Sequence, residues 1–338
     1  MIQKSTLIYI LTAAFLACCT PPPFETSEAK VDLNPPQLQD FSNSPKGLTL
    51  SFDENIELTA EDISFEPELE VSGIEMEKQS VTISTTGQIP GQEYTLRLRV
   101  NDVQGNSQDL LAAFYGYNPR LPKALINEFT TQGSSTHPDL VEIRLLEAGN
   151  IGGLCFFEGT RNNWDQRFVF PAMELLANDF LLLHTKPQGI PEEINEIQSP
   201  EISQGYDSSH QAYDFWLPQG TGLSANNGVL SLYSSPQGEL IDGLVYSNRT
   251  SQSDEKYRGF GSLKTMERAE ELFKQHGWAS GSTEIRPEDA INPDDSTATR
   301  SMGRIPGSSD SNSAEDWMIC ASREASFGAE NSAQVYKP

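Results

Sequence analysis

The residues best suited to catalysis or metal binding are spread thinly along this chain. Four histidines occur, and no two of them have the spacing of a metal-binding pair such as H-x₃-H: His137, His184, His210 and His276. The sequence contains no G-x-S-x-G nucleophile motif, no P-loop and no G-x-G-x-x-G motif. We therefore predict no catalytic residue, no metal site and no cofactor, and each histidine is interpreted as a surface or packed residue.

The cysteines fall into two groups. Cys18 and Cys19 follow an apolar run over residues 7–17, and Lys4 is the only charged residue before them. The run is shorter than the ~20 apolar residues that span a bilayer, and it has the length of a signal-peptide core. Export permits disulfides, so Cys155 and Cys320 could form a bridge, with two buried free thiols as the alternative.

The residues Phe15-Leu16-Ala17-Cys18 resemble the signal of bacterial lipoproteins. Ala17 precedes Cys18 as that signal requires, whereas Cys19 would have another cysteine before it, so we favour lipid on Cys18, with Cys19 as the alternative. The resemblance implies cleavage after residue 17, a diacylglyceryl thioether and an added acyl chain such as palmitate. Several buried acyl chains give stable anchoring. Because no Asp follows either cysteine, we expect the outer membrane rather than the inner one.

The composition is acidic, with 48 Asp and Glu against 23 Lys and Arg and a net charge of −25. Nucleic-acid binding needs clustered basic residues that neutralise phosphates, so we predict no nucleic-acid partner. A proline-rich tether over residues 18–34 follows the signal peptide, and proline runs favour extended geometry. We expect a membrane contact through covalent lipid and a protein or polysaccharide partner in the envelope.

Residues 35–118 alternate apolar and polar side chains over short runs, as in 48–52, 81–84 and 94–100. This pattern is typical of half-buried strands in a β-sandwich. The stretches 89–96, IPGQEYTL, and 102–106, DVQGN, resemble the end of bacterial Ig-like domains of the S-layer type. The resemblance implies an Ig-like sandwich that acts as a spacer.

Residues 121–334 contain a second series of strand patterns at 124–129, 139–145, 154–157, 168–171, 180–184, 228–233 and 240–246. The motifs Ile126-Asn127-Glu128, Val141-Glu142-Ile143, a hairpin ending at Asp242, Arg300 to Arg304, and Asp316-Trp317 resemble the lamin tail domain. The resemblance implies a second Ig-like sandwich. The fold class that we predict is therefore mainly β, with two sandwiches in tandem and a partly helical insert in the second.

That insert, residues 247–298, lies outside the usual lamin tail pattern. Residues 264–274 have helical periodicity, and the apolar stripe of Met266, Ala269, Leu272 and Phe273 predicts core packing, with partner recognition as the alternative. Arg and Trp are favoured at binding hot spots, so a loop with Arg161 and Trp164 is a second candidate for partner binding.

Together these features favour a lipid-anchored cell-envelope protein that acts as a non-catalytic binding or scaffolding module. The alternative is a secreted metal-dependent hydrolase that uses acidic loops of the lamin tail domain. A tight cluster of carboxylates or histidines around one pocket would favour the enzyme.

Overall fold

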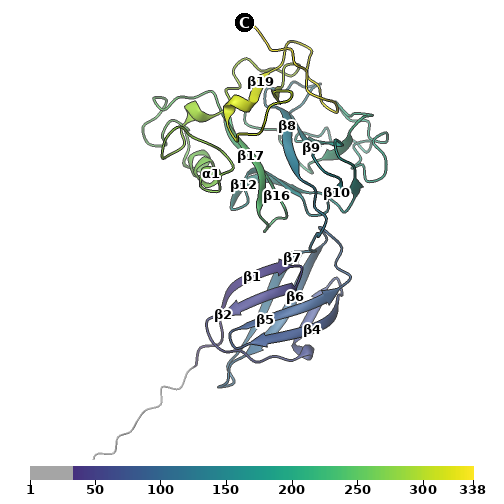
Figure 1. The fold of residues 1–338 in the computed structure, drawn as a ribbon, viewed down its shortest axis with the longest axis vertical. Helices are drawn as coiled ribbons and strands as arrows, with labels where there is room; N and C mark the ends of the chain where they lie inside the picture. Colours follow the sequence, from purple (N-terminus) through teal and green to yellow (C-terminus); the bar gives the residue numbers. More distant parts are fainter. Residues whose placement is uncertain (1–32) are drawn as a thin grey trace, which may run out of the picture. The chain divides into compact units, whose positions relative to one another are not determined.

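The computed structural model describes residues 33–338 and shows a mainly β protein, as predicted (Figure 1). The predicted signal peptide, most of the tether and the lipidation residues Cys18 and Cys19 lie outside the described residues. Residues Pro35–Pro338 form one compact unit that contains two β-sandwiches, each with its own hydrophobic core. Within residues 33–338, no helix has both the length and the apolar character needed to cross a membrane.

The first sandwich contains a four-stranded sheet, in the order β1-β2-β5-β4, and a three-stranded sheet, in the order β3-β6-β7. A short 3₁₀ helix, Ala60–Asp62, precedes β3. The strands are β1 Leu38–Ser44, β2 Gly47–Phe52, β3 Ile63–Glu66, β4 Glu70–Glu77, β5 Ser80–Thr86, β6 Glu93–Asn101 and β7 Ser107–Tyr115.

Strand β6 shows why this sequence forms a sandwich. Tyr94, Leu96, Leu98 and Val100 are buried, and the residues between them face outward. Successive side chains of a strand point to opposite faces of the sheet, so the period of two in the sequence places one apolar face inside.

The second sandwich contains a six-stranded sheet, in the order β15-β14-β9-β8-β18-β19, and a four-stranded sheet, in the order β12-β11-β16-β17. Strands β10 and β13 form a separate two-stranded sheet. The strands are β8 Ala124–Thr130, β9 Leu140–Leu145, β10 Gly149–Asn150, β11 Cys155–Thr160, β12 Asn163–Val169, β13 Glu174–Leu175, β14 Phe180–His184, β15 Tyr213–Trp216, β16 Asn227–Tyr233, β17 Leu240–Ser247, β18 Met302–Arg304 and β19 Trp317–Ile319.

One strand expected from the sequence is displaced. The pattern at 168–171 predicts a strand there, but β12 begins at Asn163 and ends at Val169. It pairs antiparallel with β11 from Thr160↔Asn163 onward, so only Arg161 and Asn162 remain in the turn. Trp164 is therefore on a strand and not in a loop as expected.

The insert contains helix α1, Leu263–Lys274, which packs on the four-stranded sheet (Figure 1). Ser262 caps its first turn by accepting a hydrogen bond from the main-chain nitrogen of Thr265 at 3.1 Å. Ala269 and Leu272 are fully buried in the main core, so the predicted packing role of the stripe is confirmed for these residues. A Cβ atom at Gly243 would lie 2.7 Å from a terminal methyl group of Leu272, so a larger residue in β17 would require the Leu272 side chain to shift.

A buried ion pair connects the two sheets of the second sandwich. The Arg304 guanidinium lies 3.0 Å from a carboxylate oxygen of Asp242, and Arg304 also donates to the main-chain oxygen of Ile126 at 2.8 Å. The Asp242 carboxylate in turn accepts from the main-chain nitrogen of Ile126 at 2.7 Å. Burial raises the pKa of Asp242 to about 6, and the Arg304 charge opposes this increase.

Two buried carboxylates hold the C-terminal segment against the strands. Glu128 and Glu142 lie opposite one another in the β8–β9 ladder and are almost fully buried. Glu128 accepts from the main-chain nitrogen and the hydroxyl of Ser326 at 2.9 and 2.7 Å, and Glu142 accepts from the main-chain nitrogen of Gly328 at 2.5 Å. Burial raises the pKa of both carboxyls, and the Glu128 charge raises the pKa of Glu142 further.

This carboxylate pair predicts a pH dependence of stability. A carboxyl whose pKa is raised by folding contributes stability below its ordinary pKa of 4.5, and this contribution is lost as pH rises through the raised value. We expect the free energy of unfolding to fall as pH rises above the ordinary value of 4.5 and through the raised pKa values, and to fall less in Glu142→Gln. Urea unfolding at several pH values measures this. The exposed variant Glu77→Gln is the control, and equal slopes in wild type and Glu142→Gln would contradict the assignment.

Candidate functional site

The two residues predicted to bind a partner differ in accessibility. The Arg161 guanidinium donates to the main-chain oxygens of Gln237 and Gly238, at 3.0 and 2.5 Å, so it holds the β16–β17 turn of its own domain. Trp164 is 42% exposed, and the Arg167 guanidinium lies 5.2 Å from its ring centre. The structure therefore gives Arg161 an internal structural contact and leaves Trp164 at the surface.

The β11–β12 turn and the insert, which are far apart in the sequence, lie against each other. Asp165 accepts from Arg268 of helix α1 at 2.8 Å and also pairs with Lys264. Glu271 of the same helix accepts from the Thr160 hydroxyl at 2.7 Å and from the Asn162 amide at 2.8 Å. The two segments that the sequence singled out for partner binding thus form one continuous surface.

Cys155 and Cys320 are both buried and free, so the disulfide alternative is wrong in this structure. Cys155 begins β11 and packs with Phe157 and Tyr233. Cys320 follows β19, with its sulfur 3.2 Å from the hydroxyl of Ser301. The two thiols lie in different packing environments, and burial raises the pKa of each.

A recess of about 550 Å³ opens beside the end of β8, and five separate segments line it. We call it the β8 recess. It contains ionisable, hydroxyl and apolar side chains. Its lining residues are Thr130, His137, Pro138, Asp207, Ser208, Ser209, His210, Gln211, Ala298, Thr299, Arg323, Ala325 and Phe327.

A histidine–carboxylate contact joins two of the loops that line the β8 recess. The Nδ1 atom of His137, in the β8–β9 loop, lies 2.7 Å from a carboxylate oxygen of Asp207, in the long loop before β15. Asp207 has a φ of 60°, in the left-handed region that non-glycine residues adopt infrequently. Asp207 thus combines an uncommon backbone conformation with a contact to His137.

A second His–Asp contact supports the recess from inside the core. His184 Nε2 lies 2.7 Å from Asp214, both side chains are fully buried, and the imidazole stacks on Trp216 with ring centres 3.7 Å apart. The other oxygen of Asp214 accepts from the main-chain nitrogen of Ser209 at 2.8 Å. Since Ser209 lines the recess, this buried pair positions one of its loops.

Sequence reasoning interpreted His137 and His210 as surface or packed residues and did not select Asp207 or Arg323. These residues form no sequence motif, because they lie on separate stretches of the chain that meet only in the folded domain. Sandwiches commonly place binding residues on loops at one end, and this was the only available signal. Within residues 33–338, no group of three or more His, Cys, Asp or Glu side chains is arranged to hold a metal ion.

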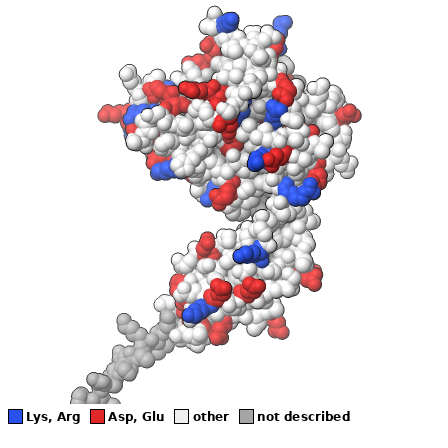
Figure 2. Space-filling view, in the orientation of Figure 1, with Lys and Arg blue, Asp and Glu red and all other residues white. Residues whose placement is uncertain are grey.

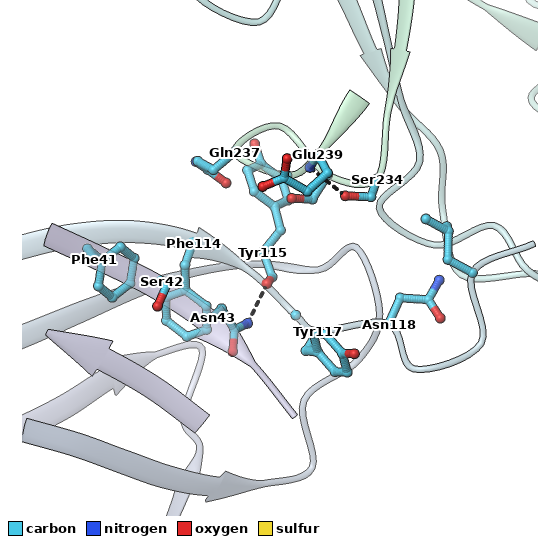
Figure 3. Close-up of a pocket in the computed structure, with 14 residues that line it drawn as sticks. Phe41, Ser42, Asn43, Phe114, Tyr115, Tyr117, Asn118, Ser234, Gln237 and Glu239 are labelled. Atoms are coloured by element: carbon cyan, nitrogen blue, oxygen red, sulfur yellow. Dashed lines mark hydrogen bonds between the residues drawn. The ribbon is translucent and has the colours of Figure 1, made fainter. Parts of the chain in front are cut away.

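A second cleft, of about 310 Å³, contains aromatic residues and the turn between β16 and β17 (Figure 3). The Asn43 amide nitrogen donates to the main-chain oxygen of Tyr115 at 2.8 Å and to Gln88 at 3.0 Å, and Glu239 donates from its main chain to the Ser234 hydroxyl at 2.9 Å. The amide oxygen of Asn43 makes no hydrogen bond. We select the β8 recess as the candidate site because it is larger than this cleft and brings two histidines, an aspartate and an arginine together.

Comparison with known proteins identifies the family of the second sandwich. The family TP_1001_2nd, described as "protein second domain", matches residues 122–319, which are more than half of the chain. The chain belongs to this family. The matched residues contain both sheets of the second sandwich, helix α1 and the buried Arg304–Asp242 pair.

Two individual proteins are also similar. An uncharacterized protein of Treponema pallidum (strain Nichols) is 26% identical over 160 residues, which are 47% of this chain. The chain spans only 40% of the length of that relative. A DUF4876 family protein from Bacteroides thetaiotaomicron VPI-5482, with a crystal structure at 2.50 Å, aligns with a TM-score of 0.30 and 13% identity over 78% of this chain and 90% of that chain.

The buried His184–Asp214 pair gives a stability prediction. Replacing Asp214 with Ala removes the partner of a buried imidazole and of the Ser209 main-chain nitrogen, so we expect a loss of about 2–4 kcal/mol in the free energy of unfolding. Urea denaturation measures this loss, and hydrogen exchange should become faster in residues 203–212. An exposed acid, Asp40→Ala, is the control. A loss below about 0.5 kcal/mol would show that the pair is not needed for the loop.

Proposed function

We propose that this chain is a lipid-anchored protein of the cell envelope, with the outer membrane favoured, whose two sandwiches act as a non-catalytic binding or scaffolding module. The observation that carries the anchor is the apolar run ending at Ala17-Cys18. The first sandwich would be an Ig-like spacer of the S-layer type, and the second a lamin tail domain that presents its loops. Both assignments rest on the sequence resemblance.

The surface chemistry supports a role outside nucleic-acid binding. On the face seen in Figure 2, acidic side chains are spread over the surface with basic ones between them. Nucleic-acid binding requires a concentrated basic patch, which the overall charge of −25 does not favour. We infer that the partner is a protein or a polysaccharide of the envelope.

The chemistry of the β8 recess supports binding more than turnover. His137 and Asp207 have the arrangement of two members of a hydrolytic triad. A triad also needs a hydroxyl or thiol on the second ring nitrogen of the histidine, and Nε2 of His137 makes no hydrogen bond to such a group within residues 33–338. We therefore propose recognition as the role of the recess.

The anchor is tested by the intact mass and membrane partition of the chain expressed in a bacterium that processes lipoproteins. We expect a mature chain that begins at Cys18 and carries the mass of its acyl groups, and we expect the lipid mass to be absent from Cys18→Ser. Cys19→Ser is the matched control and should remain lipidated. An unmodified peptide across residues 15–25 in the wild type would refute the anchor.

A further inference from the structure

Strand β7 lies at the edge of its sheet and is the longest of the four edge strands of the first sandwich. The other three have features that discourage pairing with a further strand. Strand β3 has only four residues, the β1–β2 and β4–β5 ladders each contain a register shift, and β4 has exposed glutamates. In contrast, the β6–β7 ladder is regular over all nine residues of β7, and Asp109 is the only charged residue of that strand.

The main-chain groups at the outer edge of β7 are free. Just beyond the two ends of the strand, the main-chain nitrogen of Gly116 and the main-chain oxygen of Asn106 bond to the β6 side, at 2.8 and 2.9 Å. This direction alternates with each residue of a regular antiparallel strand. The main-chain groups of Asp109, Leu111 and Ala113 therefore point away from β6, and they bond to no other residue between 33 and 338.

An apolar side chain lies at the middle of this free edge. Leu111 is 70% exposed, more than any other large apolar residue on a strand of residues 33–338. When an extended segment adds to a sheet edge, it pairs with the free main-chain groups and covers the side chains beside them. The β7 edge therefore fits a strand of another chain.

The charges around β7 favour a second copy of this chain as the source of that strand. Residues 35–118 contain 14 Asp and Glu against 4 Lys and Arg, so most surfaces of this sandwich repel an identical copy. Two of these basic residues, Arg97 and Arg99, lie on β6 directly opposite Leu111 and Asp109. Arg99 lies 3.9 Å from the Asp109 carboxylate and offsets its charge. Two copies can therefore approach through this edge with little repulsion.

The edge is also complementary to itself in one antiparallel register. A two-fold axis at Leu111 places the two leucines together and places Asp109 opposite Ala113 of the second copy. No like charges then face each other across the two strands. In this register the free main-chain groups of all three residues form hydrogen bonds with those of the second copy.

The neighbouring registers are less favourable. An axis at Asp109 would place two carboxylates opposite each other, and an axis at Leu110 would place each carboxylate opposite Leu111 of the second copy. Axes closer to the end of β7 would need the main-chain oxygen of Tyr115, which already accepts from the Asn43 amide at 2.8 Å.

We propose that two copies of this chain pair through β7, antiparallel about Leu111, so that their three-stranded sheets join into one continuous sheet. The contact is noncovalent and goes beyond the anchored binding role proposed above. A single pair of strands makes a small interface. Anchoring both copies in one membrane, as proposed, would raise their effective concentration and favour the pair.

Sedimentation velocity of the purified full-length chain in mild detergent, up to near-millimolar concentration, tests this proposal. We expect a concentration-dependent dimer in the wild type. Leu111→Lys places two lysines opposite each other at the axis, so it should raise the dimer Kd at least about tenfold. Its Tm should be unchanged, because the side chain is exposed. Ala113→Lys makes the same charge change but faces Asp109 of the second copy, so its dimer should persist.

Val103→Lys, 65% exposed in the turn between β6 and β7, is the matched control and should dimerise like the wild type. A wild type that stays monomeric would overturn the proposal, and so would an unchanged Kd in Leu111→Lys, since two chains that merely share a micelle would give that result. Loss of the dimer in Ala113→Lys would also overturn it, because the register would then be wrong. These results would not affect the anchored role, which the lipid mass on Cys18 tests separately.

Discussion

The second sandwich depends on a charge buried between its two sheets. Arg304 of β18 contacts Asp242 of β17 and the main-chain oxygen of Ile126 in β8, so one guanidinium joins strands from both sheets. Removing two charges from water costs several kcal/mol per ion, and good geometry with further hydrogen bonds is needed to offset that cost. Arg304 has this geometry, because it also donates to Asp310 at 2.8 Å and lies over the Trp317 ring at 4.9 Å.

The same buried polar layer positions the candidate site. Glu128 lies on β8, next to β18, and Glu142 lies on β9, the following strand of the sheet. They accept from the main chain at Ser326 and Gly328, and these contacts hold the segment that contains Arg323 and Phe327. His184 and Asp214 fix the opposing loop through Ser209. The recess is therefore built from loops whose ends are attached to buried carboxylates, which gives preorganised recognition groups on a rigid scaffold.

The local pattern predicted the strands and helix α1, because alternation along β6 and the stripe of Ala269 and Leu272 depend only on near neighbours. It did not predict that Arg161 donates hydrogen bonds within its own domain, because the acceptors, Gln237 and Gly238, lie in a turn 76 and 77 residues away. The recess was missed for the same reason. Five segments contribute to it, and no spacing in the sequence encodes their convergence. The thiols of Cys155 and Cys320 were undecided because pairing requires a distance, which a sequence does not contain.

A double-mutant cycle on Arg304→Met and Asp242→Asn, followed by urea denaturation, tests the central claim most directly. Each single variant leaves one charged or polar partner buried and unpaired, so we expect losses of about 3–5 kcal/mol for each and a smaller loss for the double variant than their sum. The exposed pair of Lys123 and Glu147, 2.7 Å apart, should give a much weaker coupling in the same cycle, because water screens exposed charges. Additive losses below about 1 kcal/mol at Arg304 and Asp242 would contradict the account.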